Sequence, residues 1–351
     1  MKRDQRKLAA AVAGSAALLL APSVSSAVEL GTGVELHAYG NQDYVQTGGG
    51  NTYLGADKKG SWDRNFLGLV GAITLNEKSK LWAQLETTTG EATRFTWFFL
   101  DYQFSDNMRG HFGRTKLPLG LYNEIIDAKY LHLSQLEPSI YQTSADMVHD
   151  AYHGVGLDYD QTVGNGLITW QAYAGNVYDV DPPTDSRDRR AFGGRVTYRT
   201  PIEGLRFMVS GYRTQVQLLA DNSMTNEDRT ILSADYANNG WDVKAEYAVH
   251  KFVGVKSHGY YVQVGRRVAE KWLPFVRYDY VTTDSAQSND PSFYQKTLAV
   301  GVTYQLLSNV NLRVENHFNR GYALPVVSEE VVAGAGRNNW NMFLVGVNFA
   351  F

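Results

Sequence analysis

Two sets of charged side chains could act together in this chain. The acidic set lies in one segment and comprises Glu124, Asp127 and Glu137. Carboxylates placed opposite basic side chains across a narrow aqueous opening create a transverse electric field, which orients dipolar solutes and favours hydrophilic molecules. The alternative is that the charges pair along a wall and merely solvate it. The basic candidates are Arg114, Lys116, Arg189, Arg195, Arg199, Arg277 and Arg313.

Other kinds of chemistry find less support in the sequence. His149 and His153 have a spacing that suits metal binding on a helix, but the residues around them indicate a loop that runs into a strand. The acidic residues within 179–188 could bind a divalent cation, although they are typical of a hydrated surface loop. There is no cysteine, which excludes disulfides and cysteine-ligated zinc. Ser, His and Asp are present, but no G-x-S-x-G motif is. We therefore expect no catalytic residue, metal or cofactor.

Short segments of alternating apolar and polar residues recur along the chain and must position these charges. In one example, Leu298, Val300 and Val302 share one face while Thr297 and Thr303 share the other. Such alternation predicts β-strands, and no segment after residue 28 has the ~18 consecutive apolar residues of a transmembrane helix. The predicted strands lie near 34–45, 65–75, 80–89, 94–104, 109–115, 153–161, 166–175, 189–199, 204–214, 229–237, 241–252, 257–268, 271–282, 294–305, 309–320 and 340–351.

The polar strand faces carry ionisable residues such as Lys244, Glu246 and Glu315. Such groups could not enter a dry core without a large desolvation cost, whereas they suit a water-filled lumen. The apolar faces would then face lipid. Short links alternate with longer polar ones, for example at 46–64 and 283–293. About sixteen strands with this asymmetry predict an all-β fold, a transmembrane antiparallel β-barrel.

One link breaks the pattern. The segment between Lys116 and Tyr152 is far longer than most connections, and loops of that length are usually functional or disordered. Its apolar residues, among them Ile125, Leu133 and Ile140, argue against disorder because they need a surface to pack against. We predict that this loop folds inward onto the barrel wall and constricts the pore.

The two ends of the chain carry signals of export. The first seven residues contain four positive charges, and residues 8–21 form an apolar stretch that is followed by small residues. This pattern predicts that 1–27 is a cleaved signal peptide and that 28–351 is a single barrel domain. The last strand presents an apolar face that ends at Phe351. That ending resembles the terminal signature that the barrel assembly machinery reads, so Phe351 is the predicted assembly signal.

The stretch 113–124 has the sequence Gly-Arg-Thr-Lys-Leu-Pro-Leu-Gly-Leu-Tyr-Asn-Glu. It resembles the G-R-x-K-x-P-x-G-L-Y-N-E stretch of Gram-negative porins, broadly akin to the phosphate-selective porin O/P and DcaP-like groups. Elsewhere the resemblance is one of pattern alone. It implies a sixteen-stranded, often trimeric channel with a constricting third loop. Phosphate specificity is not carried over, because it would need an identifiable lumenal set of Arg and Lys, and acids are interspersed here.

These observations lead to one expected function. The chain is expected to be a porin of the Gram-negative outer membrane, a water-filled channel for small hydrophilic or charged solutes. Its expected partners are outer-membrane lipid, lipopolysaccharide, the barrel assembly machinery and further copies of itself in a homotrimer. The net charge of −3 argues against nucleic-acid binding. An outer-membrane barrel hydrolase and an adhesin or purely structural barrel are the alternatives.

Overall fold

The computed structural model describes residues 28–31, 33–48, 50–88, 90–142, 145, 147–178, 186–324 and 337–351. The predicted signal peptide lies outside these residues, and so does most of the acidic loop at 179–188. Among the described residues, no helix is long and apolar enough to cross a membrane.

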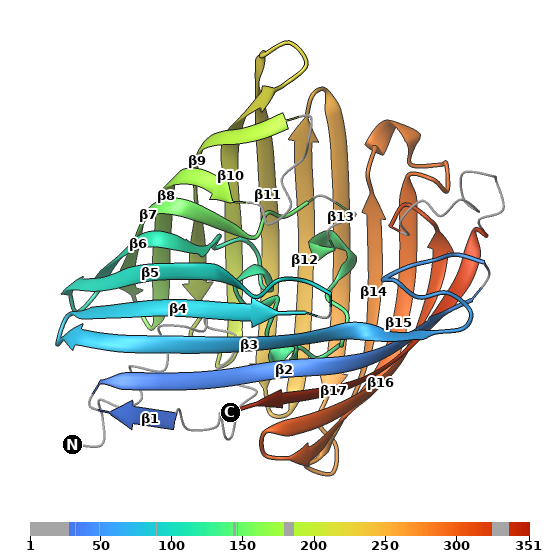
Figure 1. The fold of residues 1–351 in the computed structure, drawn as a ribbon, viewed down its shortest axis with the longest axis horizontal. Coiled ribbons are helices and arrows are strands. Elements are labelled where there is room, and N and C mark those ends of the chain that lie inside the picture. Colours follow the sequence, from blue (N-terminus) through green and yellow to red (C-terminus); the bar gives the residue numbers. More distant parts are fainter. Residues whose placement is uncertain are drawn as a thin grey trace.

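The described part of the chain forms a closed barrel of sixteen antiparallel strands, β2 to β17 (Figure 1). Each of the sixteen predicted strands is present, and the prediction of an all-β barrel is confirmed. The strands are β2 (Val34–Thr47), β3 (Ser61–Asn76), β4 (Ser79–Thr87), β5 (Arg94–Ser105), β6 (Met108–Lys116), β7 (Ala151–Val163), β8 (Gly166–Tyr178), β9 (Ser186–Arg199), β10 (Leu205–Leu218), β11 (Met224–Asn238), β12 (Trp241–Phe252), β13 (Val255–Arg266), β14 (Trp272–Thr282), β15 (Tyr294–Leu307), β16 (Val310–Gly321) and β17 (Asn339–Ala350).

Closure of the barrel joins the two ends of the chain. The last strand, β17, pairs with β2 from Met342 opposite Thr47 to Ala350 opposite Tyr39. The backbone of Phe351 continues this ladder, exchanging hydrogen bonds of 2.7 and 3.0 Å with Ala38. A short strand that the sequence did not reveal, β1 (Val28–Gly31), pairs with the next part of β2. β17 and β1 therefore cover successive parts of one edge of β2, so few backbone N–H and C=O groups of that edge are left unpaired.

Side chains sort by strand parity, as the alternation predicted. On β15, the outward Leu298 and Val300 are 42% and 38% exposed, whereas the inward Thr297 is 4% exposed. On β16, the inward Arg313 is 1% exposed and its outward neighbour Val314 is 43% exposed. An apolar outer belt around a polar interior is the arrangement of a barrel that crosses a bilayer. The charged candidates therefore belong to a lumen wherever parity turns them inward.

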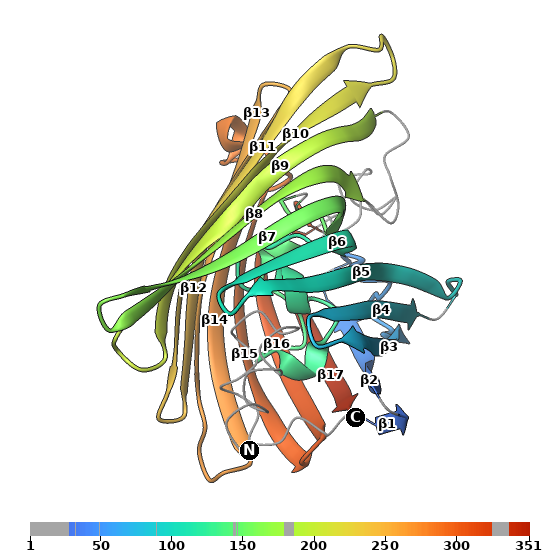
Figure 2. The ribbon, with the colours of Figure 1, turned by 90° about the vertical axis from the view of Figure 1, so that its left-hand side faces the viewer.

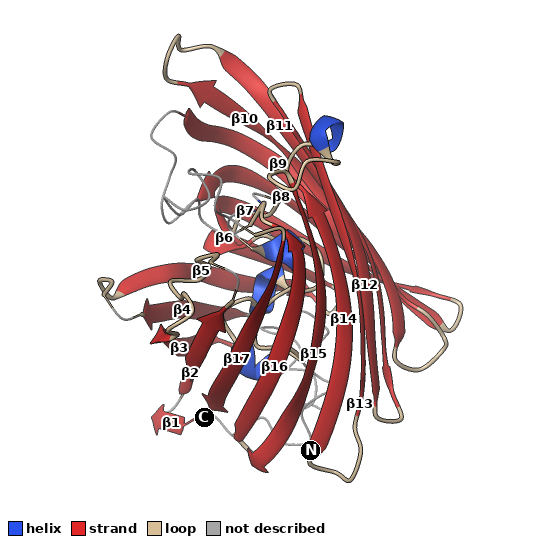
Figure 3. Ribbon diagram, turned by 90° about the vertical axis from the view of Figure 1, so that its right-hand side faces the viewer, coloured by secondary structure: helices blue, strands red, loops and turns tan. Residues whose placement is uncertain are grey.

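Residues 117–150, the inward loop, connect β6 to β7 and enter the barrel, as predicted (Figure 2). Its described residues include the single-turn helices η2 (Asn123–Ile125), η3 (Lys129–Leu131) and η4 (Ser139–Tyr141). Figure 3 shows these turns inside the barrel, and a fourth, η6 (Ser285–Gln287), at the rim. Leu117, Leu119 and Ile140 are fully buried. The apolar residues that argued against disorder therefore pack within the barrel.

Candidate pore constriction

Inward acids on one side of the barrel hold the inward loop by its backbone. Glu246 of β12 accepts hydrogen bonds from the Leu121 amide at 2.9 Å and from the Tyr141 hydroxyl at 2.6 Å. Asp279 of β14 accepts from the Ser139 amide at 3.0 Å. Glu315 of β16 accepts from the Ser134 hydroxyl at 2.8 Å and from the Gln135 amide. These acids supply acceptors to loop donors that would otherwise be buried without partners, and so fix the loop to the wall.

Two arginines on the same side hold the loop by its carbonyl groups. Arg277 donates to the Leu136 carbonyl oxygen at 2.7 Å and to the carboxylate of Asp279 at 2.7 Å. Arg313 donates to the carbonyl oxygens of Lys129 at 2.6 Å and Tyr130 at 3.3 Å, and also to that of His132. Both guanidinium groups are 1% exposed. We call strands β12 to β17, which carry these contacts, the anchoring wall.

This burial corrects the role predicted for Arg277 and Arg313. Parity does turn both side chains inward, but the inward loop covers them, so they do not line an open lumen. The prediction failed because strand alternation says nothing about a segment that packs on the strands from a distance. Each guanidinium instead supplies donors to loop carbonyls that would otherwise be buried without partners.

The opposite wall, strands β4 to β9, remains open, and here the predicted charges do meet. Arg195 of β9 lies 2.5 Å from Glu124 and also donates to the Gly120 carbonyl oxygen at 3.2 Å. Lys116 pairs with Asp127 at 2.7 Å and with Asp150. Loop acids and wall cations thus form direct ion pairs across the gap. Both interpretations of the sequence therefore apply to these residues, because charges of the loop and of the wall are opposed and are also paired.

A cavity of about 1260 Å³ lies beside these pairs and extends toward the short turns. Arg195 and Glu124 border it where it meets the inward loop, and Arg199 lies farther along the wall, where it donates to Thr169 at 2.8 Å. Its lining includes basic and acidic side chains in equal number among the described residues. The residues that carry these charges are Lys78, Lys80, Arg109, Lys116, Arg195, Arg199, Arg206, Glu77, Asp101, Asp106, Glu124, Asp158, Asp160 and Glu203.

Glu137, the third predicted loop acid, lies away from this cavity. It pairs with Lys129 within the loop and lies 3.8 Å from Arg64 of β3. Burial would raise the pKa of Glu137, but the charges of Lys129 and Arg64 outweigh burial and hold the pKa at about 2. Its carboxylate therefore fixes the loop to β3 and does not face the lining of the cavity.

Arg114 and Arg189 face outward, which corrects their predicted lumenal position. Arg114 lies over the exposed ring of Phe98, at 5.3 Å, and donates to the Phe95 carbonyl oxygen at 2.8 Å. Lys116, two residues further on, ends the strand, and its side chain borders the cavity. Arg189 bonds the outward Gln217 at 3.1 Å. A bulge opposite Thr214 and Val216 reverses the parity of β9 before Ala191.

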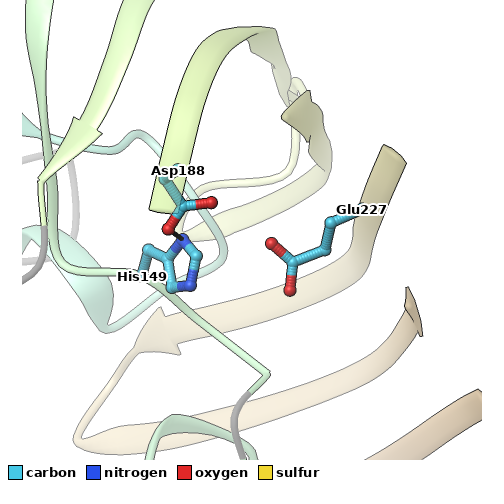
Figure 4. A group of neighbouring side chains, drawn as sticks. All are labelled: His149, Asp188 and Glu227. Atoms are coloured by element: carbon cyan, nitrogen blue, oxygen red, sulfur yellow. Dashed lines mark ion pairs between the residues drawn. The ribbon is translucent and has the colours of Figure 1, made fainter. Parts of the chain in front are cut away.

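The two histidines considered for metal binding point to opposite sides of the wall. His153 faces outward beside Arg114. His149 instead lies inside, 4.0 Å from Asp188 and near Glu227 (Figure 4), with the three ligand atoms within 4.8 Å of one another. Glu227 is already bonded by Arg229 at 2.5 Å and by His250 at 2.7 Å. As it stands, the group is an ion-pair network that ties the end of the inward loop to β9 and β11.

No protein-family model matches the chain, and no curated protein matches it. Solved structures do. OmpF of Salmonella typhi, in complex with daunomycin, has a TM-score of 0.63 at 15% identity, over 91% of this chain and 98% of that chain. The anion-selective porin of Comamonas acidovorans has a TM-score of 0.61 at 15% identity, covering 91% and 99%. The fold is that of the Gram-negative outer-membrane porins.

The outer-membrane channel DcaP of Acinetobacter baumannii is a further match, with a TM-score of 0.57 at 12% identity, over 93% of this chain and 100% of that chain. Identities this low establish the shared fold and leave the solute open. The resemblance of residues 113–124 to porins therefore agrees with the architecture. A closer relation to the phosphate-selective porins stays a prediction.

Sequence reasoning found most of the charges but missed what several of them do. Glu246 and Glu315 had been expected to face a water-filled lumen, but they, together with Asp279, bind the loop backbone instead. Their inward parity was visible in the sequence. A signal for anchoring was also present, because the inward loop contains polar residues such as Ser134 and Ser139 between its apolar ones. These residues supply the donors that the wall acids bind.

Proposed function

We propose that this protein is a passive channel of the Gram-negative outer membrane for small hydrophilic or charged solutes. One observation carries the proposal: a loop of the barrel is fixed inside the lumen and narrows it beside a cavity lined by charged side chains. A sixteen-stranded barrel has an aqueous interior, so an internal loop sets the size of the passage that remains. The porin fold supports this proposal.

The charge arrangement suggests weak ion selectivity. Among the described residues, Lys and Arg are as numerous as Asp and Glu around the cavity, and the two signs are interspersed. Arg195, Arg199 and Arg206 lie on β9 and β10, whereas Arg109 of β6 lies 3.4 Å from Asp101 of β5. A lining in which both signs are balanced does not exclude either sign of ion. We therefore propose a broad solute range.

Planar-bilayer recordings test this function. The purified protein should produce discrete conductance steps, and deletion of residues 124–140 should enlarge each step because it removes the three helical turns and most of the anchored backbone. The matched control is deletion of residues 286–291 from the exposed loop between β14 and β15, which should leave the steps unchanged. A 124–140 deletion that assembles with wild-type conductance would contradict the proposal. Lipid turnover without conductance would favour the hydrolase alternative.

Several expected features of such a channel remain proposals. These are cleavage after residue 27, assembly through the end at Phe351, and a trimeric state in the outer membrane. A third alternative, an adhesin or structural barrel, has no need of a loop held inside the lumen by many charged contacts. That loop is why we favour the channel.

A further inference from the structure

The outer surface of β9 to β13 carries basic side chains directly above the apolar belt, on the side of the long loops. Strand register places Arg213, Asp228, Lys251 and Lys256 side by side on four consecutive strands. The bulge in β9 adds Arg189 and Arg190, both exposed. We call the five cations the basic patch: Arg189, Arg190, Arg213, Lys251 and Lys256.

Among the described residues, the patch has more positive charge than its neighbours balance. Lys251 and Lys256 are exposed and directly opposite each other, and like charges in that position destabilise a sheet. The acid in this row is Asp228, which Arg213 already engages at 2.6 and 2.9 Å. An exposed pair of this kind holds little energy, so it does not prevent Arg213 from binding another anion.

A groove of about 590 Å³ opens just below the basic patch on the same outer surface. Phe192, Thr230 and Val249 line it, and Gly211 leaves space between them. Arg213, Asp228 and Lys251 border its upper edge. The next row down is apolar and aromatic, with Val209, Leu232, Tyr247 and Tyr260 on consecutive strands. The surface thus changes from lipid-facing to cationic across the groove.

This juxtaposition of cations and groove points to an amphiphile with a phosphorylated head group. Phosphates would lie against the basic patch while an acyl chain entered the groove below it. The cations form two groups, Arg189, Arg190 and Arg213 on one side of Asp228 and Lys251 with Lys256 on the other. Since strands lie ~4.8 Å apart, the two groups are about 10–15 Å from each other. That separation suits a ligand with two phosphates on a rigid sugar core.

We propose that the basic patch and its groove bind a bisphosphorylated glycolipid of the outer leaflet, the lipid A portion of lipopolysaccharide. The proposal rests on the proposed outer-membrane function, because the long loops then face the leaflet that contains this lipid. It does not depend on the channel itself, since the patch lies on the outside of the barrel. Two further outward cations, Lys296 and Arg320, lie opposite each other on β15 and β16.

Binding of fluorescent bisphosphoryl lipid A to the purified protein, refolded in lipid-free detergent, tests the site. Lys251→Gln with Lys256→Gln should weaken binding about 25-fold, because each basic side chain beside an anionic lipid contributes a factor of about five. The matched control is Arg266→Gln with Lys271→Gln, which removes two exposed charges at the short-turn end. The control should change affinity less than about twofold. Both double variants should keep wild-type conductance.

Two more probes identify the ligand. Dephosphorylated lipid A should bind weakly to every variant, and phosphatidylglycerol should bind much less tightly than bisphosphoryl lipid A. Thr230→Phe, which fills the groove, should weaken binding of the acylated lipid while the deacylated head group binds as before. Equal losses in the lysine variant and its control would overturn the proposal, as would equal affinity for phosphatidylglycerol. Conductance recorded in parallel separates failure of this site from failure of the channel assignment.

Discussion

The anchoring wall and the open wall of the barrel carry the same residue types and use them differently. On the anchoring wall, Arg277 and Arg313 are buried beneath the inward loop and bind its carbonyl groups. On the open wall, Arg195 and Arg199 border the cavity and bind mainly side chains, although Arg195 also donates to the Gly120 carbonyl oxygen of the loop. The difference shows that an inward arginine in a wide barrel is not by itself a pore-lining residue. What decides its role is whether another segment covers it.

The two walls also differ in the desolvation cost of their charged side chains. A guanidinium beneath the loop has lost its water and must be compensated by protein acceptors. Arg195 is also largely buried, at 7% exposed, whereas Arg199 beside the cavity is only half-buried. Mutations on the anchoring wall should therefore act mainly on stability and on the width of the pore. Mutations on the open wall should act mainly on ion preference. Four predictions test this division.

The largest effect is expected from Arg313→Met. The substitution removes the donors for the Lys129, Tyr130 and His132 carbonyl oxygens and leaves Glu315 buried without this cation nearby. Breaking a buried charged network costs about 3–5 kcal/mol, so urea unfolding in detergent should shift by that amount. Conductance should become larger or noisier as the loop loosens. The comparison variant Arg199→Met should cost less than about 1 kcal/mol, and equal losses would erase the distinction between the walls.

The second prediction concerns the ion pairs of Glu137, which acid should break. The pKa of Glu137 is held at about 2, below its usual value of 4.5, by Lys129 and Arg64 against the opposing effect of burial. A lowered folded-state pKa means that the stabilisation is complete above about pH 4.5 and is lost as the pH falls toward 2. The wild type should lose about 3 kcal/mol more than Glu137→Gln over that interval, measured by unfolding at several pH values. Parallel pH curves for the two proteins would show that Glu137 does not link the loop to β3.

Strand alternation was enough to predict the barrel, because the residues on the polar face of each strand must all point toward the lumen. Val300 and Thr297 illustrate this, since their opposite exposures follow from position alone. The interior was harder to predict. Arg189 faces outward because one extra residue in β9 reverses the parity, and a bulge of that kind leaves no clear pattern in the sequence.

Long-range packing explains the other differences between sequence and structure. Nothing near Arg313 in the sequence indicates that residues 129–132 will cover it, because the contact joins segments about 180 positions apart. The sequence placed Glu124 and Arg195 among the charges of the constriction but did not pair them, because the path of the loop decides which inward arginine a loop acid meets.

That pair joins the inward loop to the open wall, and it should show an intermediate effect because Arg195 is buried while Glu124 is partly exposed. Glu124→Gln and Arg195→Gln each remove one partner of a contact that is partly exposed on the side of Glu124, at 24%. A double-mutant cycle should give a coupling energy of about 1 kcal/mol, between the values for buried and exposed pairs. The single variants should shift the reversal potential in a salt gradient in opposite directions. Additive stability changes with no shift would place the pair outside the conducting path.

The smallest change in stability, and a clear change in selectivity, is expected from Arg199→Gln. Arg199 borders the cavity and donates to Thr169, and the amide of a glutamine can still donate to that hydroxyl. The free energy of unfolding should therefore change by less than about 0.5 kcal/mol. Loss of a positive charge beside the ion path should shift the reversal potential toward cations, most strongly in dilute salt, because the screening length falls from ~30 Å at 0.01 M to ~3 Å at 1 M. Arg266→Gln removes an equal charge from the outer surface and should leave the potential unchanged. If the two variants behave alike, Arg199 does not face the conducting lumen and the open wall is misassigned. A shift that vanishes in concentrated salt would show instead that this wall acts through the field of its charges, while the anchoring wall acts through contacts that salt does not reach.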